Sequence, residues 1–214
     1  MRMLLFSLRG AISCARVMTK RAKPPAKAVS TSEAADPTAP IRARKAALRT
    51  ALVEALQTAV DTARAAYQAA VEGATHAEAK AENSKDTRGL EQSYVARGQA
   101  QRVAELETGL TAVTTMTIEP QALDASGTPS PVRIGSIVVV RDQADDRCAT
   151  YWIAPAGGGT LLTEAPSAGA QSATITVVTP ASPLGRALLT RSLDDEIALG
   201  DGAKQRTFDI AAIV

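Results

Sequence analysis

Two carboxylates, Asp86 and Glu91, lie in and just after a short polar segment between two long apolar repeats. Carboxylate oxygens are hard ligands of the kind that Mg²⁺ binds, so the pair could supply part of a metal site. A structural role competes with this one, because Asp86 can cap the helix that follows and Glu91 would be a first-turn acid favoured by the helix dipole. The residues alone favour the structural role, and Glu82 is a weaker candidate ligand.

Four basic residues accompany these acids. Lys85, Arg88, Arg97 and Arg102 could contact RNA phosphates, which bind Lys and Arg through charge. On a helix of mixed charge, however, such residues more often form a solvated face. Both interpretations stay open from the sequence.

Other residues with chemical potential lack the partners they would need. His76 is the single histidine and has no accompanying ligands, so a structural or solvated role is expected. The glycines at 157–159 lack the Lys-Ser/Thr of a phosphate-binding loop, which favours a mobile loop or a hairpin turn. Ser182 precedes Pro183 without a His or Asp arrangement for nucleophilic catalysis, so it is expected to cap a helix.

Composition limits the classes of function. Aromatic residues make up only 3% of the chain, which argues against a large aromatic-lined ligand pocket. Residues 1–30 carry seven Lys or Arg and no acid, and removing these seven charges from the net +2 leaves −5 for the remainder. Nucleic-acid binders gather basic residues on a folded face, so autonomous duplex binding is disfavoured.

The cysteines and the N-terminus bear on location. Cys14 and Cys148, with one histidine, cannot form a structural zinc tetrad, and a reducing cytoplasm is expected. No run of about 18 apolar residues is present, so no transmembrane helix and no membrane partner are expected. Residues 1–17 fit a transit peptide, but the preferred interpretation is that translation starts at Met18 rather than Met1.

The elements that must position the acids begin after a disordered, basic and Pro-rich leader at 1–40. From Ile41 to about Ala81, apolar residues recur at the 3,4 spacing of coiled coils, which predicts a helix of about 60 Å. The polar segment 82–89 is a turn, and a second helix is expected at 88–113. The pattern predicts an antiparallel coiled-coil hairpin over 41–114, with its tip near 82–89. Its seam comprises Val53, Leu56, Val60, Ala63, Tyr67, Ala70, Ala74, Ala77 and Ala81, facing Ala96, Gln99, Val103, Leu106, Leu110 and Val113.

The remaining part, 115–214, has the character of a β domain. Runs rich in β-branched and aromatic residues alternate with Pro, Gly and Asp clusters, which predicts a compact antiparallel sheet. Residues 182–190 are expected to form one short helix, with Ser182 as its cap and Pro183 in its first turn. The expected strands are 133–140, 149–153, 173–178, 207–214 and a possible strand at 195–199.

The order of these segments resembles that of the Gre transcription elongation factors (the GreA/GreB type) of bacterial RNA polymerase. The resemblance is carried by residues 134–140 (Ile-Gly-Ser-Ile-Val-Val-Val), by 182–189 (Ser-Pro-Leu-Gly-Arg-Ala-Leu-Leu), by 193–197 and by 206–213. It implies an α+β fold, in which an N-terminal antiparallel coiled-coil hairpin is followed by an FKBP-like antiparallel β domain with one short helix.

The resemblance also implies a function. The hairpin would enter the secondary channel of RNA polymerase, where Asp86 and Glu91 would share a Mg²⁺ with the polymerase active site and stimulate cleavage of backtracked RNA. The protein would thus be an accessory factor of the polymerase and not itself an enzyme, and it would have no cofactor of its own. It would be cytoplasmic and monomeric. Of the four basic residues above, Lys85 and Arg88 are the predicted RNA contacts, and the 3′ end of the nascent RNA would be an indirect partner. Docking on the polymerase would fall to Ser182, Pro183 and Leu184.

Other interpretations remain open. Gre tips carry an Asp and a Glu three residues apart, whereas Asp86 and Glu91 are five apart, so a polymerase modulator that does not stimulate cleavage is an alternative. An FKBP-like domain suggests prolyl isomerase activity as another alternative. That activity needs an aromatic pocket, and residues 115–214 contain only three aromatic residues, Tyr151, Trp152 and Phe208. A third alternative is a coiled-coil protein that dimerises through the seam. The polar break at 82–89 argues against it, because it favours a hairpin within one chain.

Overall fold

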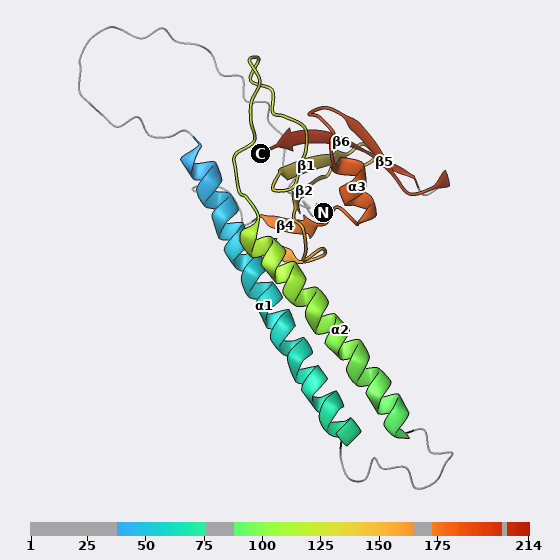
Figure 1. Cartoon of the computed structure of the whole chain (residues 1–214). Helices are drawn as coiled ribbons and strands as arrows, with labels where there is room; N and C mark the ends of the chain where they lie inside the picture. The colour runs from blue at the N-terminus through green and yellow to red at the C-terminus, as the bar shows by residue number, and fades with distance from the viewer. Residues whose placement is uncertain (1–37, 76–87, 165–172, 203–204) are drawn as a thin grey trace, which may run out of the picture. The chain divides into compact units, whose positions relative to one another are not determined.

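The computed structural model describes residues 38–75, 88–164, 173–202 and 205–214 (Figure 1). Two long helices come first and are followed by six strands and one short helix. The elements are α1 (Ala39–Thr75), α2 (Arg88–Thr115), β1 (Ile137–Asp142), β2 (Cys148–Ile153), β3 (Leu161–Thr163), β4 (Thr174–Val178), α3 (Pro183–Leu188), β5 (Glu196–Leu199) and β6 (Arg206–Ile213).

The first helix is long because nothing inside it interrupts the backbone hydrogen bonds. Pro40 occupies its second position, where a missing N–H costs nothing because the first helical N–H groups have no partner within the helix. The helix begins two residues before the expected Ile41 and spans 37 residues, which is about 55 Å. The expected continuation to Ala81 lies beyond Thr75, outside the described residues.

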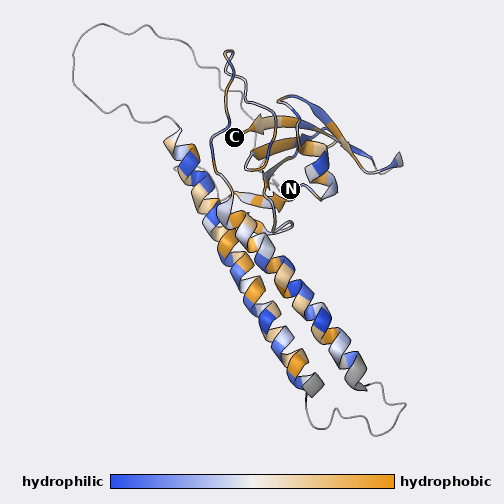
Figure 2. Cartoon of the chain, viewed as in Figure 1, coloured by the Kyte–Doolittle hydropathy of each residue, from blue (hydrophilic) through white to orange (hydrophobic). Residues whose placement is uncertain are grey.

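Helices α1 and α2 lie side by side (Figure 1), and hydrophobic residues recur along both of them (Figure 2). The expected seam is confirmed in the described part: Leu56, Val60 and Ala63 are buried on α1, and the six seam residues of α2 are buried or half-buried. The buried face of α1 begins earlier than expected, at Lys45, Leu48 and Leu52. The two helices therefore form the hairpin predicted within one chain.

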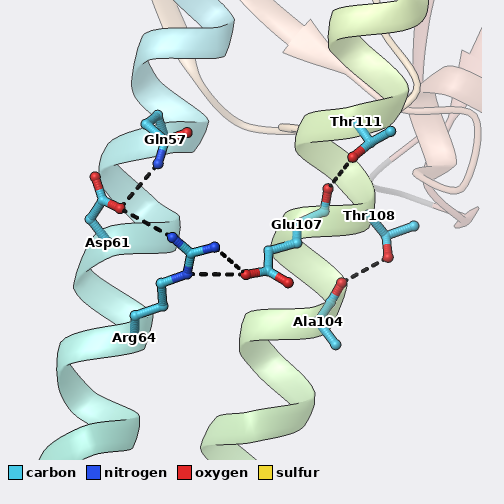
Figure 3. A network of polar contacts seen from close by, with 7 residues as sticks. All are labelled: Gln57, Asp61, Arg64, Ala104, Glu107, Thr108 and Thr111. Carbon is cyan, nitrogen blue, oxygen red and sulfur yellow. Dashed lines mark hydrogen bonds and ion pairs between the residues drawn. The ribbon is translucent and has the colours of Figure 1, made fainter.

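An ion pair links the two helices across the hairpin surface (Figure 3). The guanidinium of Arg64 donates to Glu107 Oε1 from Nη2 at 2.5 Å and from Nε at 3.0 Å. Asp61 lies 4.0 Å from Arg64 and accepts a hydrogen bond of 3.0 Å from Gln57. Both Arg64 and Glu107 are exposed, so the pair is expected to contribute no more than about 1 kcal/mol.

The sheet has the strand order β3-β4-β2-β1-β6-β5. Four of its strand pairs are antiparallel, but β2 and β4 are parallel, so the expectation of a wholly antiparallel sheet is wrong at this pair. The cause is β3, a strand of three residues that the sequence did not reveal because it is shorter than the runs that signal strands. The chain forms β3 at the edge first and then returns as β4 between β3 and β2, which makes β4 parallel to β2.

Residues alternate between the two faces of this sheet, and each face has its own core. On one face Ile137, Trp152 and Ile175 pack in a cluster with Leu52 and Val113 of the hairpin. On the opposite face the cluster contains the strand residues Val138, Val140, Ile153, Val178 and Ile210, with Leu188 of α3. The base of the hairpin thus covers one face and α3 packs on the other, as expected for an α+β fold with a helical hairpin and one short helix.

Candidate functional site

The hairpin continues well beyond the core that it shares with the sheet. Leu56 is the last α1 residue in that shared core, whereas the buried Val60 and Ala63 are packed outside it. From Leu56 to Thr75 the helix rises for about 28 Å along its own axis. The described hairpin therefore carries its distal end far from the β-sheet core along α1.

The candidate tip residues fall on both sides of the boundary of the described structure. Glu82, Lys85 and Asp86 lie outside the described residues, as does His76. Glu91 is exposed in the first turn of α2, where the partial positive charge of the helix N-terminus stabilises an acid. This position is compatible with the structural role and with metal binding.

The described residues alone do not form a complete metal site. No group of three or more His, Cys, Asp or Glu side chains that could hold an ion occurs among residues 38–75, 88–164, 173–202 and 205–214. A Mg²⁺ ion takes six oxygen ligands and keeps several waters, so one or two carboxylates suffice when phosphates or another protein complete the shell. The chemistry of Glu91 fits such a shared site.

Of the candidate RNA contacts on α2, only Arg97 and Arg102 have side chains that the structure describes. Arg88 is the first residue of α2, whereas Arg97 and Arg102 lie further along it with exposed side chains. Arg102 lies 4.0 Å from Glu105, one turn further along the helix. Between the basic residues, Tyr94 is 64% and Val95 is 54% exposed. The sequence reasoning gave no role to these two, although their positions off the apolar seam indicated exposure.

Ser182 caps α3, as expected. Its Oγ accepts a hydrogen bond of 3.0 Å from Gly185 N and donates one of 2.8 Å to Thr179 O. Pro183 follows at the first helical position and is exposed. A Cβ at Gly185 would lie 2.0 Å from Thr179 O, so this position admits only glycine. The Ser-Pro-Leu-Gly segment is therefore explained locally by the cap, and its role in docking stays a prediction.

An open cavity of about 520 Å³ lies beside this cap. Pro183, Leu184, Val178 and Tyr151 are among the residues that line it, and its surface is largely apolar. Leu184 also packs against the α3-side core, so the exposed contribution of the helix is centred on Pro183. The three residues predicted to dock thus share one surface depression.

The aromatic residues of the β domain do not converge on this cavity. Tyr151 lines it, but Trp152 is fully buried in the core on the opposite face of the sheet. Phe208 lies beneath the guanidinium of Arg206, which is 5.7 Å from the centre of its ring. Tyr151 and Phe208 line a second depression of about 200 Å³, but Trp152 belongs to the core on the other face of the sheet, so the three rings do not surround one pocket as a prolyl isomerase would need.

The glycines at 157–159 connect β2 to β3, two strands that are not paired with each other, so of the two expected alternatives the hairpin turn is wrong and the segment is a loop. Gly157 has a φ of +81°, and a Cβ there would lie 2.7 Å from Leu52 Cδ1 of α1. On the other helix, a Cβ at Gly109 would lie 2.9 Å from Ala156 Cβ. The loop is therefore a close-packed part of the joint between hairpin and sheet.

Basic side chains complete this joint. Lys45 is fully buried and its Nζ donates a hydrogen bond of 3.0 Å to Glu119 O. Burial lowers the pKa of Lys45 from 10.5 to about 8, and the charges of Arg133 and Arg44 act in the same direction. Arg44 itself donates two hydrogen bonds, of 2.5 and 2.8 Å, to Glu164 at the end of β3. Sequence reasoning missed Lys45 because the seam was sought among apolar residues.

Comparison with known proteins gives the following. No family model and no curated protein matches the chain. Similar solved structures include Gfh1 (GreA factor homolog 1) of Thermus thermophilus, at 19% identity over 76% of this chain and 94% of that chain, with a TM-score of 0.31. Thermus aquaticus Gfh1 is 21% identical over 75% and 92%, with a TM-score of 0.31. The transcription elongation factor GreA/GreB from Nitrosomonas europaea is 16% identical over 58% and 91%, with a TM-score of 0.29.

At such TM-scores these likenesses decide neither the family of the chain nor its function. No helix in the described part of the chain is long and apolar enough to cross a membrane.

Proposed function

We propose that this protein is a transcription elongation factor that inserts its helical hairpin into the secondary channel of bacterial RNA polymerase and acts on backtracked RNA. The proposal rests on the resemblance of this sequence to the Gre factors at residues 134–140, 182–189, 193–197 and 206–213. The observation that carries it furthest is the hairpin, because α1 extends about 28 Å past the core shared with the sheet toward the acid-bearing tip. A rod of this kind can deliver side chains to a centre buried inside another protein.

The tip would act by placing carboxylates at the polymerase active site. Asp86 and Glu91 would hold a Mg²⁺ shared with the polymerase, and the exposed first-turn position of Glu91 supports this role. A bound Mg²⁺ lowers the pKa of water and neutralises charge on a phosphate during phosphodiester cleavage. The polymerase would perform the cleavage, and this chain would contribute ligands and position.

The α3 surface would dock the β domain on the polymerase. Pro183 is exposed beside a largely apolar depression, while the hydrogen bonds of Ser182 hold the turn in one conformation. A rigid, partly apolar surface loses little entropy on binding, which favours docking. Leu184 would support this surface from its half-buried position.

The test uses purified protein and halted, backtracked elongation complexes of a bacterial polymerase. We expect the protein either to shorten the RNA from its 3′ end or to compete with a known cleavage factor. Asp86→Ala and Glu91→Ala are expected to abolish cleavage without loss of binding, and Pro183→Ala is expected to weaken binding. If the protein neither binds core polymerase nor changes these complexes, the proposed function is wrong.

The second candidate is a polymerase modulator that does not stimulate cleavage. It is favoured by the five-residue separation of Asp86 and Glu91, in place of the three-residue separation of Gre tips. In that case the protein competes with a cleavage factor for the channel, and neither Asp86→Ala nor Glu91→Ala alters the RNA products.

A further inference from the structure

Two large apolar side chains lie exposed near the tip end of α2. Tyr94 is 64% and Val95 is 54% exposed, and both stand outside the seam that Ala96 begins on this helix. Burying a tyrosine ring is favourable, because aromatic side chains bring a large apolar area. An exposed ring on the part of the hairpin that would enter another molecule is therefore available for contact there.

The neighbours of Tyr94 on the helix are of two opposite charges. Glu91 precedes it by three residues and Arg97 follows it by three, and both side chains are exposed. Residues three apart lie on neighbouring positions of the helix surface, about 5–6 Å apart at Cβ. The three side chains form a row of carboxylate, ring and guanidinium, which we call the Tyr94 row.

The surface one turn beyond the ring is open. Gly98, four residues after Tyr94, has no side chain, and a Cβ added there would meet nothing within 4 Å. A flat group lying on the ring of Tyr94 could extend over this backbone without a clash. A longer residue at position 98 would fill that space.

We propose that Tyr94 is a stacking platform for the unpaired base at the 3′ end of backtracked RNA. The inference rests on the proposed function. It adds a residue that binds the nucleotide by stacking, whatever the identity of its base. Base–aromatic stacking is tolerant of base identity and contributes about 1–3 kcal/mol per base. Arg97 would meet a phosphate of the same strand, and Glu91 would lie on the metal side of the nucleotide.

The charges of the row favour RNA over an apolar wall of the polymerase as the occupant. An apolar protein pocket around Tyr94 would also have to remove water from the exposed charged groups of Glu91 and Arg97, and taking charged groups out of water is costly. A nucleotide instead offers a phosphate to the guanidinium and leaves the carboxylate facing solvent or a cation. The alternation of charge, ring and charge thus matches one strand of nucleic acid.

The experiment measures dissociation constants of the full-length protein for three partners. These are core polymerase without RNA, backtracked complexes with a normal unpaired 3′ nucleotide, and the same complexes with an abasic 3′ nucleotide, all with Ca²⁺ replacing Mg²⁺ to keep the RNA intact. We expect the wild type to bind the normal complex about 5- to 150-fold more tightly than the abasic one. Tyr94→Ala should remove this difference and Tyr94→Phe should keep it.

Val95→Ala is the matched control, because it removes a neighbouring exposed apolar side chain from another part of the helix surface. It is expected to leave the difference between normal and abasic complexes unchanged, and circular dichroism should show the same helix content for all variants.

Three results would overturn the inference, and each has a different meaning. If Tyr94→Ala weakens binding to RNA-free polymerase as much as to backtracked complexes, the ring contacts the protein wall. If Tyr94→Ala binds all three partners like the wild type, the ring contacts nothing there. If the wild type does not bind core polymerase at all, the proposed function fails and the inference fails with it.

Discussion

The buried lysine at the joint makes stability depend on pH in a specific way. Lys45 is fully buried and its pKa is about 8 in the folded protein, against 10.5 ordinarily. Between these values the unfolded chain holds the proton that the folded chain has lost, so the free energy of unfolding rises with pH. Below pH 8 both states are protonated, and the full cost of burying the charge is present.

The size of this effect follows from the pKa difference. A pKa of about 8 instead of 10.5 corresponds to about 3 kcal/mol. Part of this shift comes from the charge of Arg133, which is exposed, so solvent screening reduces the expected effect to about 2 kcal/mol. Lys45→Met keeps the length of the side chain and removes the titrating group.

The assay is urea unfolding followed by circular dichroism at pH values from 7 to 10.5. Relative to Lys45→Met, the wild type should gain about 2 kcal/mol of stability between pH 7 and 10.5. Arg42→Met is the control, because it removes an exposed cation one turn away from Lys45. Parallel pH profiles for the wild type and Lys45→Met would refute the reasoning.

Three further predictions concern single side chains. Gly98→Ala should stabilise the protein by up to about 1 kcal/mol through helix propensity. Gly109→Ala in the same helix should destabilise it, because the added Cβ would lie 2.9 Å from the β-carbon of Ala156. Equal shifts of the urea midpoint for the two variants would contradict the close packing of the joint. Arg64→Gln should cost less than about 1 kcal/mol, and nothing in 1 M salt, because its ion pair with Glu107 is exposed. Ser182→Ala should cost about 1 kcal/mol through loss of the cap, and a thermal midpoint equal to that of the wild type would contradict this.

The hairpin could be predicted from sequence because its signal is periodic. Apolar residues at the 3,4 spacing gave both helices and their facing seams, and the cap at Ser182 was recognisable from local chemistry alone. Such features depend on neighbours within one or two turns. The sequence therefore carries them directly.

Features that depend on contacts between distant segments could not be predicted. The parallel pairing of β2 and β4 follows from β3, whose three residues give too short a pattern to recognise. Lys45 occupies a seam position where an apolar residue is expected. Its burial is explained only by the backbone oxygen of Glu119, a distant residue that accepts a hydrogen bond from Lys45 Nζ. From the sequence, Gly157 is expected to be a flexible loop residue. In the structure it lies close to Leu52 and belongs to the packed joint between hairpin and sheet.

This joint bears on the candidate site because of leverage. With about 28 Å of α1 beyond the shared core, a tilt of about 5° at the joint would move the distal end of the helix by about 2.5 Å. A misplacement of about 1 Å at a reacting centre can cost 10²-fold in rate. The close packing at Gly109 and Gly157 therefore limits tilt where it would matter most. Under the proposed function, substitutions in the joint should impair action on backtracked RNA more than they impair binding to the polymerase, although they lie far from the tip.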